Sequence, residues 1–342
     1  MLGAVSGAKT IGRYFTVVSF LPSVPFVAYI ILLQKSGAWG GRVHLGRALV
    51  SLDTTDAVIL GVGSLTLAMA LHPLQFAFVQ FFEGYWGSSR LAVSAATMCM
   101  ERHRRRQRTL TAEAWRREEA FKKKDPPSVI EAARGTLAAL VRAVESGRQA
   151  TYYPTDLAMI MPTRLGNVLR RYELEAGRAY GLDCLTVLPR IMQRADQRDI
   201  DYVQNQRTQL DLAVRTAVLG LAAAVTTVAY MHDHGVWLLL SLAPYGLAFA
   251  AYRGAVRVAH EYGMSLAVLL DLNRFTLYEQ LHLEMPDGLG AERELNSRLM
   301  PLLGLDQYAR SAFRQPVPLS APFMYHHPDP GPVVETDSSD SG

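Results

Sequence analysis

The chain has 342 residues, of which 49% are hydrophobic and 19% charged, and its formal net charge is +4. Charged residues make up about a quarter of an ordinary soluble domain, so this composition argues against one and indicates a chain that lies partly in lipid. The two cysteines, Cys99 and Cys184, form no CxxC pair and no zinc-ligand spacing. We expect them to be reduced thiols in a cytoplasmic segment.

Four apolar stretches predict membrane-spanning helices. Each is long enough, or nearly so, to cross roughly 30 Å of hydrocarbon at about 1.5 Å per residue. They are Tyr14–Gln34, Ala57–Phe81, Leu210–Met231 and Val236–Ala259. The first is too long for the apolar core of a secretory signal, so we interpret it as the first span. The sequence therefore predicts an all-α fold, a four-span helical membrane protein with long cytoplasmic helical extensions.

The first two spans contain prolines and polar residues. Pro22 and Pro25 should kink the first span, because each removes a helical hydrogen bond. His72 and Gln75 lie inside the second span beside Pro73, and polar residues at such a depth are functional candidates. They could line a polar path, or His72 could relay protons. The structural alternative is that Pro73 kinks the helix and His72 bonds a freed carbonyl.

The distribution of positive charge predicts the topology. Residues Phe82–Thr208 hold most of the chain's 35 lysines and arginines, whereas the joint His232–Gly235 holds none. The positive-inside rule then places this basic middle and both termini in the cytoplasm, in a protein of the plasma membrane. The tip His232–Gly235 and the connection Lys35–Asp56 lie outside. Three basic residues in that connection are the one conflict.

Two arginines stand near the predicted cytoplasmic ends of the last two spans. We expect Arg215 and Arg253 to snorkel toward lipid phosphates. Arg215 could also pair with Asp211, which lies one helical turn away.

The cytoplasmic middle is predicted to begin with a long helix, Ser88–Lys124, which Asp125-Pro126-Pro127 ends before a second helix, Val129–Ser146. An arginine cluster on the first helix is a candidate for contact with anionic lipid headgroups, each charge contributing about 1 kcal/mol near the surface. A merely solvated face is the alternative, and nucleic acid is disfavoured because no stacking aromatics are interleaved. The cluster consists of Arg102, Arg104, Arg105, Arg106 and Arg108.

A further helix, Thr163–Tyr180, follows Pro162 and should end at Gly181. Its apolar face is expected to pack on a cytoplasmic stalk, which is the part of the helical arm from Val236 to about Leu283 that extends beyond the membrane. The face is Leu165, Val168, Leu169 and Tyr172, and its expected partners are Leu266, Leu269, Leu270 and Leu277. The stalk's polar residues could form a polar site or, as we favour, hold this helix by complementary contacts. These residues are Asp271, Asn273 and Arg274 on the stalk, with Arg164 and Asn167 on the helix.

Four regions follow along the chain. Residues 1–87 form an N-terminal two-span membrane hairpin, and 88–195 a basic cytoplasmic helical region. Residues 196–285 form a long helical hairpin that holds spans three and four. Residues 286–342 form a cytoplasmic C-terminal tail, whose Pro, Ser, Asp and Gly content predicts disorder from about residue 314.

Two sets of motifs carry a resemblance. They are the run Pro162–Arg170 with Tyr180–Asp183 and Leu188–Arg190, and Tyr262-Gly263 with Asp271–Phe275 and Leu277-Tyr278. In these the chain resembles a family of uncharacterised actinobacterial multi-pass integral membrane proteins, over roughly Thr151–Pro286. The family pattern has His at the position of Asn273. The resemblance implies a mostly helical multi-pass fold and carries no known activity.

No P-loop, HExxH, GxSxG or ordered Ser/His/Asp set occurs, so we expect a non-enzymatic protein without a cofactor. His232 and His234 flank Asp233, but one short turn cannot close a metal site by itself, and a polar hairpin tip explains them equally well. The leading hypothesis is an anchored cytoplasmic scaffold or sensor that binds the lipid bilayer and an unknown cytoplasmic protein.

The alternative is an oligomeric channel or transport component, a homo-oligomer whose spans pack through small residues. These are Gly61, Gly63, Ala68, Gly220, Ala224, Gly246 and Ala250.

Overall fold

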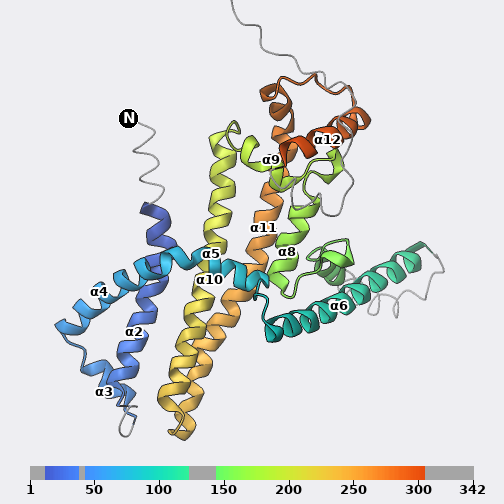
Figure 1. Cartoon of the computed structure of the whole chain (residues 1–342). Helices are drawn as coiled ribbons and strands as arrows, with labels where there is room; N and C mark the ends of the chain where they lie inside the picture. Colours follow the sequence, from blue (N-terminus) through green and yellow to red (C-terminus); the bar gives the residue numbers. More distant parts are fainter. Residues whose placement is uncertain (1–11, 38–42, 123–143, 305–342) are drawn as a thin grey trace, which may run out of the picture. The chain divides into compact units, whose positions relative to one another are not determined.

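The computed structural model describes residues 12–37, 43–122 and 144–304. All regular structure in these residues is helical, which confirms the predicted all-α class (Figure 1). The chain groups into two compact units. The first unit contains the described residues up to 174 together with 201–266, and the second contains 175–200 together with 267–304. The four regions expected from the sequence divide the chain differently, and that division stays a prediction.

Four helical stretches are long and apolar enough to cross a membrane, as predicted. They are Gly12–Lys35, Thr54–Glu83, Gln197–Met231 and Gly235–Gln280. Each apolar segment chosen from the sequence lies inside one of them. The side of the membrane on which the termini lie stays a prediction.

The first span changes its helical type at its prolines. Residues Phe15–Phe20 form a π-helix, η1, and Leu21–Lys35 form α2. Pro22 falls in the first turn of α2, where a missing N–H is tolerated. The wider π-helical turns of η1 precede Pro22. The disturbance that we expected from the prolines therefore takes the form of a change from π-helix to α-helix at Leu21.

The second span consists of two α-helices joined by a 3₁₀ turn. Helix α4 (Thr54–Leu71) gives way at Pro73 to η2 (His72–Leu74), and α5 (Gln75–Glu83) follows. Asp53 and Asp56 form a capping box at the start of α4. Asp56 also pairs with Lys35 at the end of α2. This ion pair ties the ends of the first two spans together, beside the short helix α3 (Leu45–Val50).

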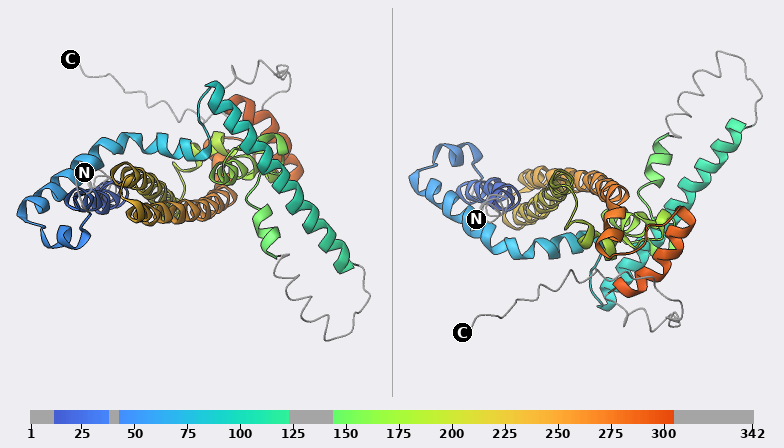
Figure 2. Two further views of the ribbon diagram at one scale, coloured as in Figure 1. Left: turned by 90° about the horizontal axis from the view of Figure 1, so that it is seen from below. Right: turned by 90° about the horizontal axis from the view of Figure 1, so that it is seen from above.

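The last two spans form a tight hairpin. Helix α10 (Gln197–Met231) turns through η5 (Gly235–Ser241) into α11 (Leu242–Gln280). Both views in Figure 2 draw α10 and α11 side by side. A Cβ added at Gly220 would lie 3.0 Å from the Pro244 oxygen and 3.1 Å from the Ala248 Cβ, so the small residue permits the close approach.

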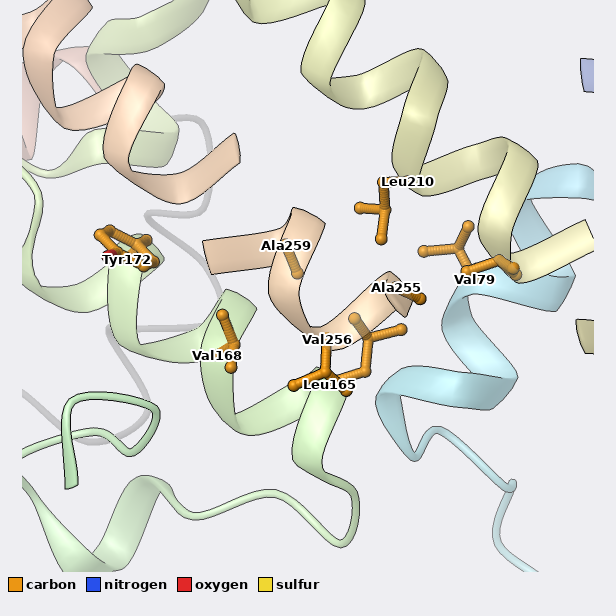
Figure 3. Close-up of a cluster of buried hydrophobic side chains, with 9 residues drawn as sticks. Val79, Leu165, Val168, Tyr172, Leu210, Ala255, Val256 and Ala259 are labelled. Atoms are coloured by element: carbon orange, nitrogen blue, oxygen red, sulfur yellow. The ribbon is translucent and has the colours of Figure 1, made fainter. Parts of the chain in front are cut away.

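The core of the first unit lies where α5, α8 (Arg164–Glu175), α10 and α11 meet (Figure 3). Its buried members are Val79, Leu165, Val168, Tyr172, Leu210, Val214, Ala255, Val256 and Ala259. The apolar face of α8 therefore packs on an earlier part of α11 than the stretch from Leu266 onward that we expected. Small side chains at Ala255 and Ala259 leave room for the larger residues of α8.

Helix α8 ends earlier than the sequence indicated. It stops at Glu175, Gly177 adopts a left-handed φ of 78°, and a 3₁₀ turn, η4 (Arg178–Tyr180), follows. The predicted end at Gly181 was therefore wrong for the α-helix, although Gly181 is also left-handed and closes the 3₁₀ turn.

Helix α6 (Arg90–Lys122) matches the long basic helix that was predicted. Leu110 on α6 packs with Tyr153 and Ile160 around the 3₁₀ turn η3 (Leu157–Met159). The predicted helix Val129–Ser146 falls mostly outside the described residues, which are helical over 144–150.

The second unit contains α9 (Cys184–Ile191), the end of α11 and α12 (Leu289–Leu303). Helix α12 lies within the region 286–342 that we assigned to a C-terminal tail, where we had predicted no helix. Tyr278, Leu283 and Leu299 form the buried cluster between α11 and α12. The predicted disorder from about residue 314 lies outside the described residues.

Candidate functional site

A buried arginine on α10 is the centre of a polar network among the first three spans. Arg215 is 0% exposed. Its Nε donates to Gln75 Oε1 at 2.9 Å, and its Nη2 donates to the Leu71 carbonyl at 3.0 Å. The prediction that Arg215 snorkels toward lipid phosphates is therefore wrong. Its guanidinium bonds α4 and α5, and not Asp211, which was the alternative partner.

The 3₁₀ turn at Pro73 explains why Leu71 accepts this bond. In an α-helix the Leu71 carbonyl would bond the N–H of Gln75. That N–H instead bonds His72, so Leu71 loses its α-helical partner. An unpaired carbonyl inside a membrane costs several kcal/mol. Arg215 satisfies the carbonyl freed beside Pro73, a role that the structural alternative gave to His72.

Asp211 joins the network from the other side. Only 3% of it is exposed. Its Oδ2 accepts from the Tyr14 hydroxyl at 2.8 Å and lies 3.3 Å from the Arg207 Nε. The backbone oxygen of Asp211 accepts from Gln75 Nε2 at 3.0 Å. The network therefore links Tyr14, the residue before the π-helix of the first span, with α5 of the second span and with α10.

Sequence reasoning missed Tyr14 and Arg207 as members of this network. A signal was present, because Arg207, Asp211 and Arg215 recur every four residues and so share one face of α10.

His72 and Gln75, which the sequence grouped, face different partners. Gln75 is buried, with 7% exposure, in the Arg215 network. His72 is exposed, its Nδ1 lies 3.0 Å from the Ser19 hydroxyl, and its ring packs edge-on at 5.5 Å from Phe15. Gln75 therefore belongs to the buried network, and His72 lies outside it on the exposed surface.

A second polar feature of the first unit is a cavity of about 310 Å³ rich in arginine, which we call the arginine cavity. Helices α6, α8 and α11 line it together with residues 145–153. Its charged residues are Arg106, Arg148, Arg164, Arg253, Arg257 and Glu145, and its aromatic ones are Tyr152, Tyr153, Tyr252 and Phe249.

One carboxylate stands among these five guanidinium groups. Glu145 accepts from the Arg148 Nη2 at 2.9 Å and from the Gln149 Nε2 at 3.0 Å. These hydrogen bonds, with the charges of Arg148 and Arg257, lower the pKa of Glu145 and keep it ionised. Arg106 donates to the Gln149 Oε1 at 2.9 Å.

The other three guanidinium groups of the arginine cavity have no such partner. Within the described part of the chain, no carboxylate lies within 4.0 Å of Arg164, Arg253 or Arg257. Arg253 lies over the Phe249 ring at 5.7 Å.

The predicted lipid-contact cluster on α6 divides between two environments. Arg104 donates to the Leu157 carbonyl at 3.1 Å, and Arg106 faces the arginine cavity. Arg102, Arg105 and Arg108 are exposed. Lipid contact stays a prediction for these three residues, whereas the other two hold the segment 149–157 against α6.

His103 on α6 is held neutral at physiological pH. Its Nδ1 lies 2.9 Å from the Tyr153 hydroxyl. Burial and the charges of Arg164, Arg106 and Arg102 lower the pKa of His103 from 6.5 to about 4.

The residues that were predicted to join the stalk to α8 fall into two sets, one in each compact unit, and each set has its own hydrogen-bond partners. In the first unit, Asn167 is 0% exposed and bonds the Met161 N–H at 2.9 Å and the Met161 carbonyl at 2.8 Å. It thereby closes the turn before α8, while Arg164 lines the arginine cavity.

In the second unit, Arg274 pairs with Glu292 of α12 at 3.0 Å, and its Cζ lies 4.2 Å from the Tyr180 ring centroid. Arg274 also donates to the backbone oxygen of Asp271, and Asn273 donates to the Leu269 carbonyl at 3.0 Å.

The partners of this second set were missed, because α12 was not expected. Glu292 also accepts from the Tyr278 hydroxyl at 3.1 Å, and the Asn296 Nδ2 donates to the same hydroxyl at 2.7 Å. All three side chains are buried. The cluster fastens α12 to the end of α11, which is a structural role.

At the hairpin tip, His232 and Asp233 contact each other at 2.8 Å. Among residues 12–37, 43–122 and 144–304, no group of three His, Cys, Asp or Glu side chains is placed to hold a metal ion. No family model matches the chain, and neither a curated protein nor a solved structure shows significant similarity to it, so the resemblance of its motifs stays a prediction.

Proposed function

We propose that the protein is a non-enzymatic, membrane-anchored scaffold or sensor whose cytoplasmic helices follow the position of its spans. The observation that carries the proposal is the attachment of the start of α8 to the end of α5. The Thr163 hydroxyl lies 2.6 Å from the Phe82 carbonyl oxygen and 3.0 Å from that of Glu83, so it can donate to either. These are the last carbonyls of the second span, which helix termini leave without intrahelical partners.

The attachment leaves no free space. A Cβ added at Gly166 would overlap the carbonyl oxygen of Glu83. On its other side, α8 packs through Val168 and Tyr172 on α11. A displacement of the second span relative to the fourth therefore changes the position of α8, because packed contacts shift between discrete arrangements and do not stretch.

The distribution of positive charge supports the orientation of the protein in the membrane. The spans anchor the chain in the plasma membrane, and both termini and α6 face the cytoplasm. Exposed arginines on α6 lie near anionic headgroups. A cytoplasmic protein binds the helical surface that α6 and α8 present.

Proximity labelling tests the proposal. A labelling enzyme fused to the C-terminus should recover a definite cytoplasmic protein that an unrelated membrane anchor does not recover. Thr163→Val, which removes the hydroxyl bonds to α5, should change the yield of that protein. Thr109→Val is the matched control, because the Thr109 hydroxyl bonds only its own helix at Arg105. Labelling indistinguishable from the unrelated anchor would refute the scaffold.

The second candidate is an oligomeric channel or transport component. The buried charges of Asp211 and Arg215 favour it, because ionisable residues inside a membrane often mark a substrate path. Gly61 and Gly246 have open space around them and could face another subunit. Reconstituted bilayers should then show a conductance that His72→Leu alters. Repeated recordings without conductance would reject this candidate.

A further inference from the structure

We infer that the arginine cavity binds a phosphate group, presented as a phosphomonoester by a lipid headgroup or by a soluble molecule. The inference goes beyond the proposed function. It holds whether the chain is a scaffold or part of a transporter, because it concerns binding alone.

The charge balance of the cavity is the first argument. Five arginines and one glutamate line it. Glu145 is held by Arg148 and balances that charge. The remaining four guanidinium groups give the lining a net positive charge, which an anion bound among them would offset.

The kind of anion follows from the donors. A guanidinium presents its N–H groups as a planar fork that matches two oxygens of a phosphate. Arg164, Arg253 and Arg257 come from two helices and leave these forks without a carboxylate among the described residues. A single carboxylate would leave most of this charge unbalanced, whereas a phosphomonoester carries about two negative charges and three acceptor oxygens.

The size and walls of the cavity fit a phosphate attached to a small group. Its volume of about 310 Å³ is at the lower end of the range for small-molecule sites. Tyr152, Tyr153 and Tyr252 supply aromatic surface and hydroxyl groups beside the arginines.

The position along α11 suggests the two sources. Phe249 lies one turn before Arg253, where the apolar part of the fourth span gives way to charge. We expect this transition at the headgroup level of the membrane, which both a lipid phosphate and a cytoplasmic phosphate can reach.

The full-length protein in phosphatidylcholine nanodiscs tests the inference with two probes. In one arm, inorganic phosphate is titrated calorimetrically in phosphate-free buffer. In the other, the nanodiscs contain phosphatidic acid, and native mass spectrometry counts the lipid retained on the protein. Binding in the first arm identifies a soluble source, and retention in the second identifies a lipid source.

Variants assign the binding to the cavity. Arg253→Gln and Arg257→Gln should each weaken it at least about tenfold, because each removes a charged hydrogen-bond donor. Glu145→Gln should strengthen it, because it removes the one negative charge. Arg108→Gln, an exposed change on α6 outside the cavity, is the matched control and should leave binding unchanged.

Circular dichroism and the melting temperature check that each variant is folded. Arg253 and Arg257 are exposed side chains, so we expect both variants to fold. Binding in neither arm would overturn the inference. So would binding that is unchanged in both folded arginine variants, or that falls as far in Arg108→Gln.

Discussion

The Arg215 network makes a prediction about coupling between two side chains. Arg215→Met keeps a long apolar side chain and removes the guanidinium. It leaves the Gln75 Oε1 and the Leu71 carbonyl without their donor, and both lie in a buried interface. Each unsatisfied group costs about 1–3 kcal/mol, so for the two groups we expect a loss of about 2–6 kcal/mol of stability. Gln75→Leu should cost a similar amount, because it leaves a buried cation without one of its acceptors.

The double variant separates this explanation from simple loss of packing. When both partners are replaced by apolar residues, neither leaves the other unsatisfied, and only the Leu71 carbonyl still lacks its donor. Arg215→Met with Gln75→Leu should therefore be more stable than the sum of the single variants predicts, by at least about 1 kcal/mol. Equilibrium unfolding in mixed micelles of dodecyl maltoside and dodecyl sulfate measures the free energies.

A matched control uses a hydroxyl elsewhere on α10. Thr226 bonds only the Ala222 carbonyl of its own helix. It lies about 16 Å along the helix from Arg215, at about 1.5 Å per residue. Thr226→Val with Gln75→Leu should be additive within about 0.5 kcal/mol. If the Arg215 pair is also additive, the hydrogen bond between Arg215 and Gln75 does not hold α5 to α10, and the network has been misinterpreted.

Three further predictions concern other parts of the chain. A cysteine at Asp233 should react with an impermeant thiol reagent on intact cells, whereas Cys99 and Cys184 should not, and labelling of either would reverse the topology. Because the pKa of His103 falls from 6.5 to about 4 on folding, the unfolded chain binds more protons between these values. The contribution of His103 to the free energy of unfolding should be fully present above pH 6.5 and should fall by about 1–2 kcal/mol toward pH 4, a value reduced for the partial exposure of the ring. His103→Gln should make the melting temperature less dependent on pH in this range. Gly166→Ala should lower the melting temperature by several degrees, because its Cβ overlaps a backbone carbonyl of α5, and an unchanged value would show that α8 does not dock there.

The membrane spans were predictable because length and hydropathy alone identify them. The 3₁₀ turn at Pro73 and the π-helix before Pro22 follow from missing N–H groups, so the sequence indicated where each helix is disturbed. Which form the disturbance takes depends on the partner of the freed carbonyl. At Leu71 that partner is Arg215, 144 residues further along the chain. No local pattern could identify it.

Other errors have equally specific causes. Gly177 and Gly181 both allow a left-handed φ, and the sequence does not say which of them ends α8. Helix α12 carries Leu295, Leu299 and Leu303 at helical spacing, a signal that we did not use when we assigned residues 286–342 to the tail. The arginine cavity was not foreseen, because its arginines lie on four separate segments of the chain.

The charged face of α10 also affects how the protein is made. During synthesis, α2, α4 and α5 leave the ribosome before α10 does, and with them Tyr14 and Gln75. An aspartate or arginine costs about 2.5–3.5 kcal/mol at the centre of an isolated span during insertion by the translocon, and less near its end, where Asp211 and Arg215 lie. Tyr14 and Gln75 are the side chains that receive Asp211 and Arg215 in the finished protein. Insertion of the third span is therefore coupled to the earlier insertion of the first two, and a chain that began after them would expose Arg215 to hydrocarbon without its partner.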